Sequence, residues 1–105
     1  MTVESTAAVF RGGMDLTPTP ADVKIDRGTG LLLPTHGVSL SSDPMLVERF
    51  GGAFQVESIV EGLVIRQRGK RLTHYELMPA QPMTMDRYQE LLQRVVLKRF
   101  SGSRG

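Results

Sequence analysis

The 105-residue sequence contains no cysteine. This absence excludes a disulfide framework, catalysis by a thiolate and every thiolate metal site, so the stability of the fold has to come from packing. It leaves the cellular compartment open, because reducing and oxidising surroundings both allow a chain without cysteine. Apolar residues make up 40% and charged residues 23% of the chain, which is typical of a folded globular domain.

Long apolar runs are absent as well. No run approaches the roughly 18 apolar residues that a membrane-spanning helix needs, so we expect no membrane partner. Residues 1–10 have neither a basic start nor a long apolar stretch, and we therefore expect no Sec export. The length predicts a single domain over residues 1–105, with flexible ends at 1–6 and 101–105.

Histidine and aromatic residues are scarce. Two histidines, without cysteine or an acidic pair at ligand spacing, give no metal-site signature, so we expect no metal. Basic residues cluster at 66–71 and again at 94–104, and such clusters can attract phosphates or an acidic partner. No aromatic side chains interleave with them for base stacking, and solvated faces explain most of the charge, so nucleic acid is the weaker interpretation.

The apolar run at 7–10 predicts the first strand, which ends at Gly12-Gly13 with Arg11 emerging at the sheet edge. Short apolar or alternating segments predict the further strands, at 31–33, 38–40, 54–56 with Ile59, 63–65 and 72–77.

Two helices are expected among these strands. Ser42-Asp43-Pro44 is typical of a helix start and Gly51-Gly52 of a helix end, which predicts a brief helix over 45–50. Thr84 is typical of the cap of a second helix, which starts at Met85 and keeps helical spacing of its apolar residues through Val96. Strands with two segregated helices predict an α+β fold with a compact, mixed β-sheet.

Two places in the sequence could carry chemistry. Strand alternation puts His74 and Glu76 on one face and Tyr75 on the other, so an imidazole and a carboxylate could address one site; a solvated polar face is the alternative. Arg11 ends an apolar strand, and with Gly12 behind it the guanidinium could grip a phosphate while the backbone approaches the ligand closely. An ordinary edge-strand arginine is the alternative there.

Three blocks of the sequence resemble a known family. The stretch Thr73-His-Tyr-Glu-Leu-Met-Pro-Ala-Gln-Pro-Met83 resembles the signature T-H-Y-x-x-M-P-A-x-P-M of the second-numbered Tse (type VI secretion exported) effectors, which are ADP-ribosyltransferase-like toxins. Phe10-Arg-Gly12 is similar to the aromatic-Arg start of that family, and the segment from Gly30 to Ser39 is similar to its G-L-x-x-P to G-x-S segment. The order of the three blocks along the chain also agrees.

The resemblance implies a compact split-sheet fold that binds NAD. By this similarity Arg11 would neutralise the pyrophosphate, Ser39 would orient the nicotinamide ribose, and the Gly12 amide would meet the carboxamide. Glu76 or His74 would be the catalytic residue, because cleavage of the nicotinamide bond builds positive charge on the ribose. Tyr75 would stack on the nicotinamide, with core packing as the alternative for this side chain.

The implied function is that of a toxin that acts in a bacterial cytoplasm, delivered by type VI secretion or made inside the cell. It would transfer ADP-ribose to a macromolecular target or hydrolyse NAD, and an immunity or antitoxin protein would neutralise it. A non-catalytic binding module that keeps the same fold is the alternative.

Overall fold

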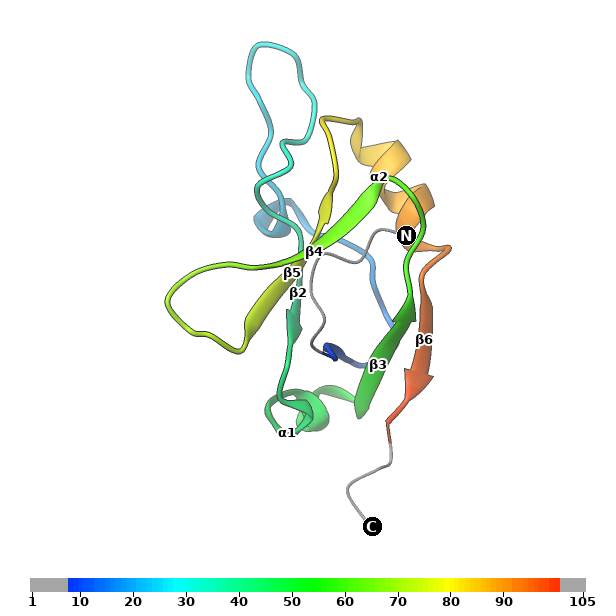
Figure 1. The fold of residues 1–105 in the computed structure, drawn as a ribbon. Helices are drawn as coiled ribbons and strands as arrows, with labels where there is room; N and C mark the ends of the chain where they lie inside the picture. Colours follow the sequence, from blue (N-terminus) through cyan, green and yellow to red (C-terminus); the bar gives the residue numbers. More distant parts are fainter. Residues whose placement is uncertain (1–7, 101–105) are drawn as a thin grey trace.

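The structure is a computed structural model that describes residues 8–100, and the ends predicted to be flexible, 1–6 and 101–105, lie outside the described residues. Its centre is one six-stranded sheet in the order β4-β5-β2-β1-β3-β6 (Figure 1). The strands are β1 (Phe10–Gly12), β2 (Val38–Ser41), β3 (Ala53–Ser58), β4 (Leu63–Gln67), β5 (His74–Pro79) and β6 (Val96–Arg99).

All neighbouring strands of this sheet run antiparallel. The predicted α+β class is confirmed, whereas the predicted mixed sheet is wrong. A parallel pair needs a crossover connection of a dozen or more residues, usually a helix. Here α2 lies in the connection from β5 to β6, which have β2, β1 and β3 between them in the sheet order and do not pair.

The sheet is joined weakly at its middle. Strands β1 and β2 share a single register pair, Phe10 with Ser41, whereas β2 and β5 share four pairs and β4 and β5 share five. The sheet therefore consists of one half with β4, β5 and β2 and another with β1, β3 and β6. Beyond the pair of Phe10 and Ser41 no further register pair joins the two halves, and Figure 1 shows β2 and β3 as separate arms of the sheet.

Two helices begin where the sequence predicts them. The short α1 (Pro44–Val47) is capped by the Asp43 carboxylate, which accepts a hydrogen bond from the Met45 amide at 3.0 Å. It continues as the 3₁₀ helix η2 (Glu48–Phe50), which ends at Gly51 in the left-handed region at φ 106°. The second helix, α2 (Met85–Leu92), is capped by the Thr84 hydroxyl, which accepts from the Arg87 amide at 3.1 Å. A further 3₁₀ turn, η1 (Pro20–Asp22), lies in the loop before β2.

Two predicted elements are wrong in extent. The second helix was expected to run through Val96, but α2 ends at Leu92, and Val96–Arg99 forms β6 against β3. β-Branched residues fit a pleated surface well, and the hydrogen bonds offered by β3 decide in favour of the strand. The strand expected at 31–33 is reduced to isolated bridges from Leu32 to Ile25 and to Met83.

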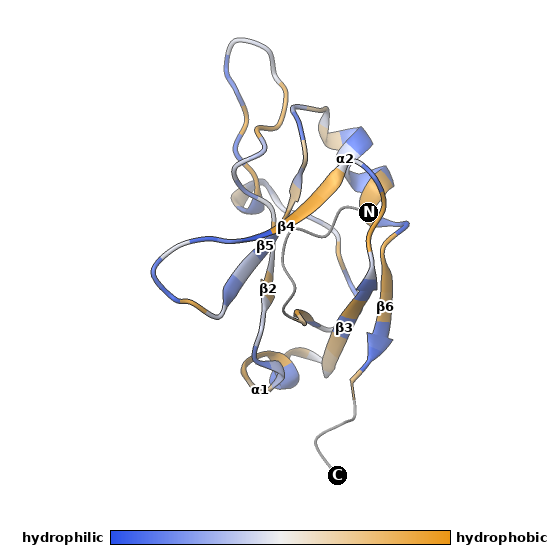
Figure 2. Ribbon diagram, in the orientation of Figure 1, coloured by the Kyte–Doolittle hydropathy of each residue, from blue (hydrophilic) through white to orange (hydrophobic). Residues whose placement is uncertain are grey.

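The main core lies between α2 and one face of the sheet. Figure 2 shows β4, an edge strand of this sheet, as hydrophobic over most of its length. Paired residues on neighbouring antiparallel strands share a face, and faces alternate along a strand. The row Ile65, Leu77 and Val38 faces this core, where it meets buried side chains of α2 and of the preceding loops: Leu32, Met83, Tyr88, Leu91 and Leu92. The adjacent row, Arg66, Glu76 and Ser39, therefore belongs to the opposite face.

Within residues 8–100, no helix has both the length and the apolar character that a membrane span requires.

Candidate functional site

The centre of the candidate site is the carboxylate of Glu76, which is only 3% exposed. Its Oε1 atom accepts a hydrogen bond from the Gly37 amide at 2.9 Å. Its Oε2 atom lies 2.8 Å from Nε2 of His74 and 3.0 Å from Nε of Arg68. The imidazole and the carboxylate thus meet on one face of β5, as strand alternation suggested. Both oxygens of the carboxylate are engaged by groups of the chain itself.

These contacts decide the ionisation of Glu76. Burial favours the neutral acid and by itself raises the pKa, but hydrogen bonds from Arg68, His74 and the Gly37 amide outweigh burial and hold the pKa of Glu76 below its ordinary value. The side chain is therefore a fixed negative charge at neutral pH. It can stabilise a developing positive charge, but it cannot donate a proton as a general acid.

No local pattern in the sequence singles out Gly37, which lies in the Pro-Thr-His-Gly stretch before β2. A Cβ atom at this position would lie 2.0 Å from the carbonyl oxygen of Leu77 and 2.6 Å from its carbonyl carbon. Only glycine allows the start of β2 to come this close to β5. The close approach is what brings the Gly37 amide to the carboxylate of Glu76.

A second residue that the sequence did not mark as part of the site is Tyr88 of α2. Its hydroxyl accepts a hydrogen bond from the Val38 amide at 3.1 Å and donates one to the Leu77 carbonyl. Val38 and Leu77 are paired residues of β2 and β5, so the hydroxyl bridges the two strands beside the pair formed by Ser39 and Glu76. The ring is fully buried, and burial raises the pKa of Tyr88. Helical spacing identified it as a core residue only.

Arg11 crosses the weak middle of the sheet. Its Nη1 atom donates to the backbone carbonyl of Ser39 at 2.9 Å, and its Nε atom donates to the carbonyl of Asp15 at 3.1 Å. The side chain thus extends from β1 towards β2, the strand that pairs with β5. Ser39 in turn is the register partner of Glu76.

Three of the predicted ligand-binding residues line one hollow of about 300 Å³. They are Arg11, Gly12 and Ser39, and the remaining walls come from Leu40, Val47 and Phe50. His74 and Glu76 are not among the lining residues. The hollow and the carboxylate are connected only through the cross-strand pair of Ser39 and Glu76.

Tyr75 lies apart from these groups. Its register partners are Leu40 and Gln67, which places the ring on the face opposite Glu76, half-buried against the core. The geometry agrees with core packing, the alternative that alternation favoured for this side chain.

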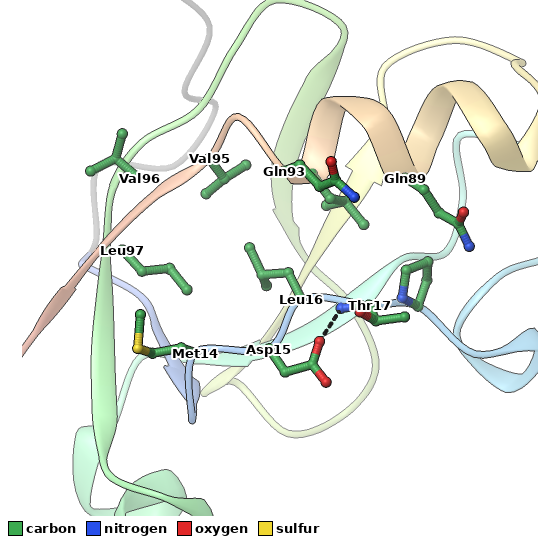
Figure 3. A pocket seen from close by; sticks show the side chains of 11 residues that line it. Met14, Asp15, Leu16, Thr17, Gln89, Gln93, Val95, Val96 and Leu97 are labelled. Carbon is green, nitrogen blue, oxygen red and sulfur yellow. Dashed lines mark hydrogen bonds between the residues drawn. The ribbon is translucent and has the colours of Figure 1, made fainter.

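A larger hollow of about 580 Å³ lies elsewhere (Figure 3). It is enclosed by the loop 14–18, the end of α2 and the start of β6, and Figure 3 shows Leu16, Val95 and Leu97 around it. None of the predicted site residues lines it. Asp15 lines this larger hollow, and its carbonyl accepts a hydrogen bond from Nε of Arg11, which lines the smaller one. This larger hollow and the candidate chemistry therefore lie in different places.

Residues 8–100 contain no group of three or more histidine and acidic side chains placed to hold a metal ion. No protein-family model matches the chain, and a search of curated proteins finds no match.

Proposed function

We propose that this chain is an ADP-ribosyltransferase-like toxin that uses NAD, either to transfer ADP-ribose to a macromolecule or to hydrolyse the dinucleotide. One observation carries the proposal: Arg11 of β1 reaches across the split sheet to Ser39, and Ser39 is the cross-strand partner of Glu76. These contacts support the proposal because they connect one residue from each of the three sequence blocks that carry the resemblance. The T-H-Y-x-x-M-P-A-x-P-M stretch supports the same interpretation.

The donor set around the smaller hollow fits parts of NAD. A guanidinium suits a pyrophosphate because its fork of N–H groups matches phosphate oxygens, and within residues 8–100 Arg11 donates from Nε and Nη1 to backbone carbonyls. The exposed hydroxyl of Ser39 can bond to a ribose hydroxyl, and Gly12 lines the same hollow. The side of Gly12 that has no Cβ is packed against Val47 and Phe50. A hollow of about 300 Å³ is at the lower end of the usual range for ligands, so it would hold one part of the dinucleotide.

The reaction itself breaks the bond from ribose C1′ to nicotinamide. Nicotinamide leaves with the bonding electron pair, and an oxygen or nitrogen nucleophile of water or of a macromolecule bonds to C1′ and loses a proton. The fixed charge of Glu76 would stabilise the positive charge that develops on the ribose. His74, about a third exposed and in contact with Glu76, could take up the proton that the nucleophile loses.

A non-catalytic binding module is the second candidate. It is favoured by the two engaged oxygens of Glu76, which give this carboxylate a complete structural role without any ligand. It is also favoured by the position of the larger hollow away from the candidate site.

Calorimetric NAD binding, together with NAD consumption followed by nicotinamide release, tests the proposal. The unmodified chain should bind and consume NAD, and Arg11→Ala should weaken binding at least about tenfold through loss of a charge-assisted contact. Arg94→Ala removes an exposed cation at the end of α2 and serves as the matched control. Binding without consumption would support the binding module, and absence of binding would refute both uses of NAD.

The toxin part of the proposal has its own test. Expression of the chain in a bacterial cytoplasm should arrest growth, and Arg11→Ala should restore it while the protein level stays the same. A cognate immunity protein should restore growth of cells that make the unmodified chain. Growth that is indifferent to the chain would contradict the toxin assignment even if NAD binds.

A further inference from the structure

The hairpin loop between β4 and β5 concentrates positive charge. Four of the 13 lysines and arginines of the chain fall within six consecutive residues, and no acidic residue lies among them. We call the end of β4 together with this loop, residues 66–73, the basic hairpin; its cations are Arg66, Arg68, Lys70 and Arg71. All four are exposed, and Figures 1 and 2 show the loop as a hydrophilic projection away from the body of the sheet.

Side-chain and backbone hydrogen bonds define the shape of the basic hairpin. The Gln67 side chain donates from Nε2 to the carbonyl of Gly69 at 2.9 Å and to the carbonyl of Arg71 at 3.0 Å. The Arg68 amide donates to the His74 carbonyl at 3.2 Å, and the His74 amide donates to the Arg71 carbonyl at 3.0 Å. Gly69 adopts φ 89°, which a residue with a side chain rarely tolerates. These internal hydrogen bonds fix the conformation of the loop, and this reduces the conformational entropy that is lost when its cations bind a partner.

The charge of the basic hairpin is largely unneutralised. Arg68 pairs with Glu76 through Nε at 3.0 Å. Arg66, Lys70 and Arg71 form no ion pair with any of residues 8–100. The row that contains Arg66 continues across the sheet to Glu76 and Ser39, so the positive surface reaches the face of the candidate site.

We propose that the basic hairpin binds the sugar-phosphate backbone of a nucleic acid, without reading its sequence. Three of the four cations are arginines, whose forked donors match phosphate oxygens. The loop has no aromatic residue that could stack on a base, so its contacts are those of phosphate recognition, which position a nucleic acid but do not select a sequence.

An acidic protein is the competing partner, and the surface favours it less. Protein interfaces depend on a cluster of apolar or aromatic anchors near their centre. The basic hairpin exposes one large apolar side chain, Leu72, which is 77% exposed. A surface of cations around a single apolar residue fits a phosphate backbone better. This proposal does not depend on the use of NAD.

Fluorescence anisotropy with labelled mixed-sequence probes, a single-stranded RNA and a DNA duplex of about 20 nucleotides per strand, tests the proposal between about 50 and 200 mM NaCl. Three to four phosphate contacts predict that the logarithm of the affinity for the duplex falls with the logarithm of the salt concentration with a slope of about −3. Lys70→Gln combined with Arg71→Gln should reduce the size of this slope by about two and weaken binding at least about tenfold.

Lys24→Gln combined with Arg27→Gln is the matched control, because it removes two exposed cations from a different loop. This control should keep the affinity and the salt slope of the unmodified chain. Circular dichroism should show that both double variants fold, and both should retain any NAD binding of the unmodified chain.

Three results would overturn the proposal. One is the absence of binding to both probes at about 50 mM NaCl, where phosphate contacts are strongest. Another is an equal loss of affinity in the two double variants, which would reduce the effect to net charge. The third is displacement of the probes by polyglutamate with a stronger affinity than that of the nucleic acids, which would assign the surface to an acidic protein.

Discussion

The backbone amide of Gly37 donates a hydrogen bond to the carboxylate of Glu76 at 2.9 Å, although the two residues are 39 positions apart in the sequence. This contact ties the segment before β2 to the middle of β5, and it supplies one of the three donors that keep Glu76 ionised. The site thus depends on an approach of two backbones that no local pattern encodes.

Replacing Glu76 by glutamine should lower the free energy of unfolding at neutral pH by about 2 to 3 kcal/mol, because a buried charge-assisted network loses its anion. Chemical denaturation of the purified chain measures this change. Glu90→Gln is the control, since Glu90 forms only an exposed ion pair with Arg87 and should cost less than about 0.5 kcal/mol. An equal effect of both changes would contradict the structural role of Glu76.

The same carboxylate predicts a dependence of stability on pH. The pKa of Glu76 is lowered in the folded chain from an ordinary value of 4.5, so the folded state binds fewer protons than the unfolded state in this range. Its contribution is fully present above about pH 4.5 and is lost as the pH falls through the folded pKa. Stability of the unmodified chain should therefore fall more steeply below pH 4.5 than stability of Glu76→Gln. Parallel curves for the two proteins would contradict the lowered pKa.

Gly37→Ala should destabilise the chain strongly, by about 3 kcal/mol or more, because the new methyl group would overlap the Leu77 carbonyl and force β2 away from β5. Gly28→Ala is the matched control, because a Cβ at that position meets only Asp26 at ordinary contact distances. Thermal unfolding compares the two. If Gly37→Ala melted like Gly28→Ala, the close approach of the strands would be wrong.

Tyr88→Phe should lower the free energy of unfolding by about 1 to 3 kcal/mol, because the Val38 amide and the Leu77 carbonyl lose a buried partner. The ring itself is retained, so packing changes little. If Tyr88→Phe kept the full stability, the hydroxyl would not be needed as a hydrogen-bond partner of Val38 and Leu77, and the prediction would be wrong.

Alkaline titration tests the environment of Tyr88 separately. Burial raises the pKa of Tyr88 above the ordinary value of 10.0, so the folded chain holds the phenol proton more tightly than the unfolded chain does. The stability that the protonated Tyr88 side chain contributes is therefore fully present below pH 10.0 and is lost as the pH rises beyond it. In a Tyr75→Phe background, which leaves Tyr88 as the sole tyrosine, phenolate absorbance should appear only together with unfolding. Phenolate formation in a folded chain near pH 10.0 would contradict the buried position.

Local chemistry of the sequence determined much of the secondary structure. Asp43 and Thr84 start the two helices because a short oxygen-bearing side chain can accept from the free amides of a first turn. Gly51 ends the first helix because it tolerates a positive φ. Alternation placed His74 and Glu76 on one face of a strand, where the structure has them in contact. These features depend on residues within a few positions of one another, and the sequence by itself contains that information.

Tertiary structure decided the rest. The helical spacing of apolar residues runs through Val96, yet Val96–Arg99 forms β6, because β3 offers hydrogen bonds that outweigh the local preference. Segments far apart in the chain meet in the antiparallel sheet, and two such contacts lie at its middle. One is the register pair of Phe10 and Ser41, and the other is the hydrogen bond from Arg11 to the Ser39 carbonyl. Hydrogen bonds and close packing between distant segments depend on the whole fold, which periodicity and capping signals do not specify.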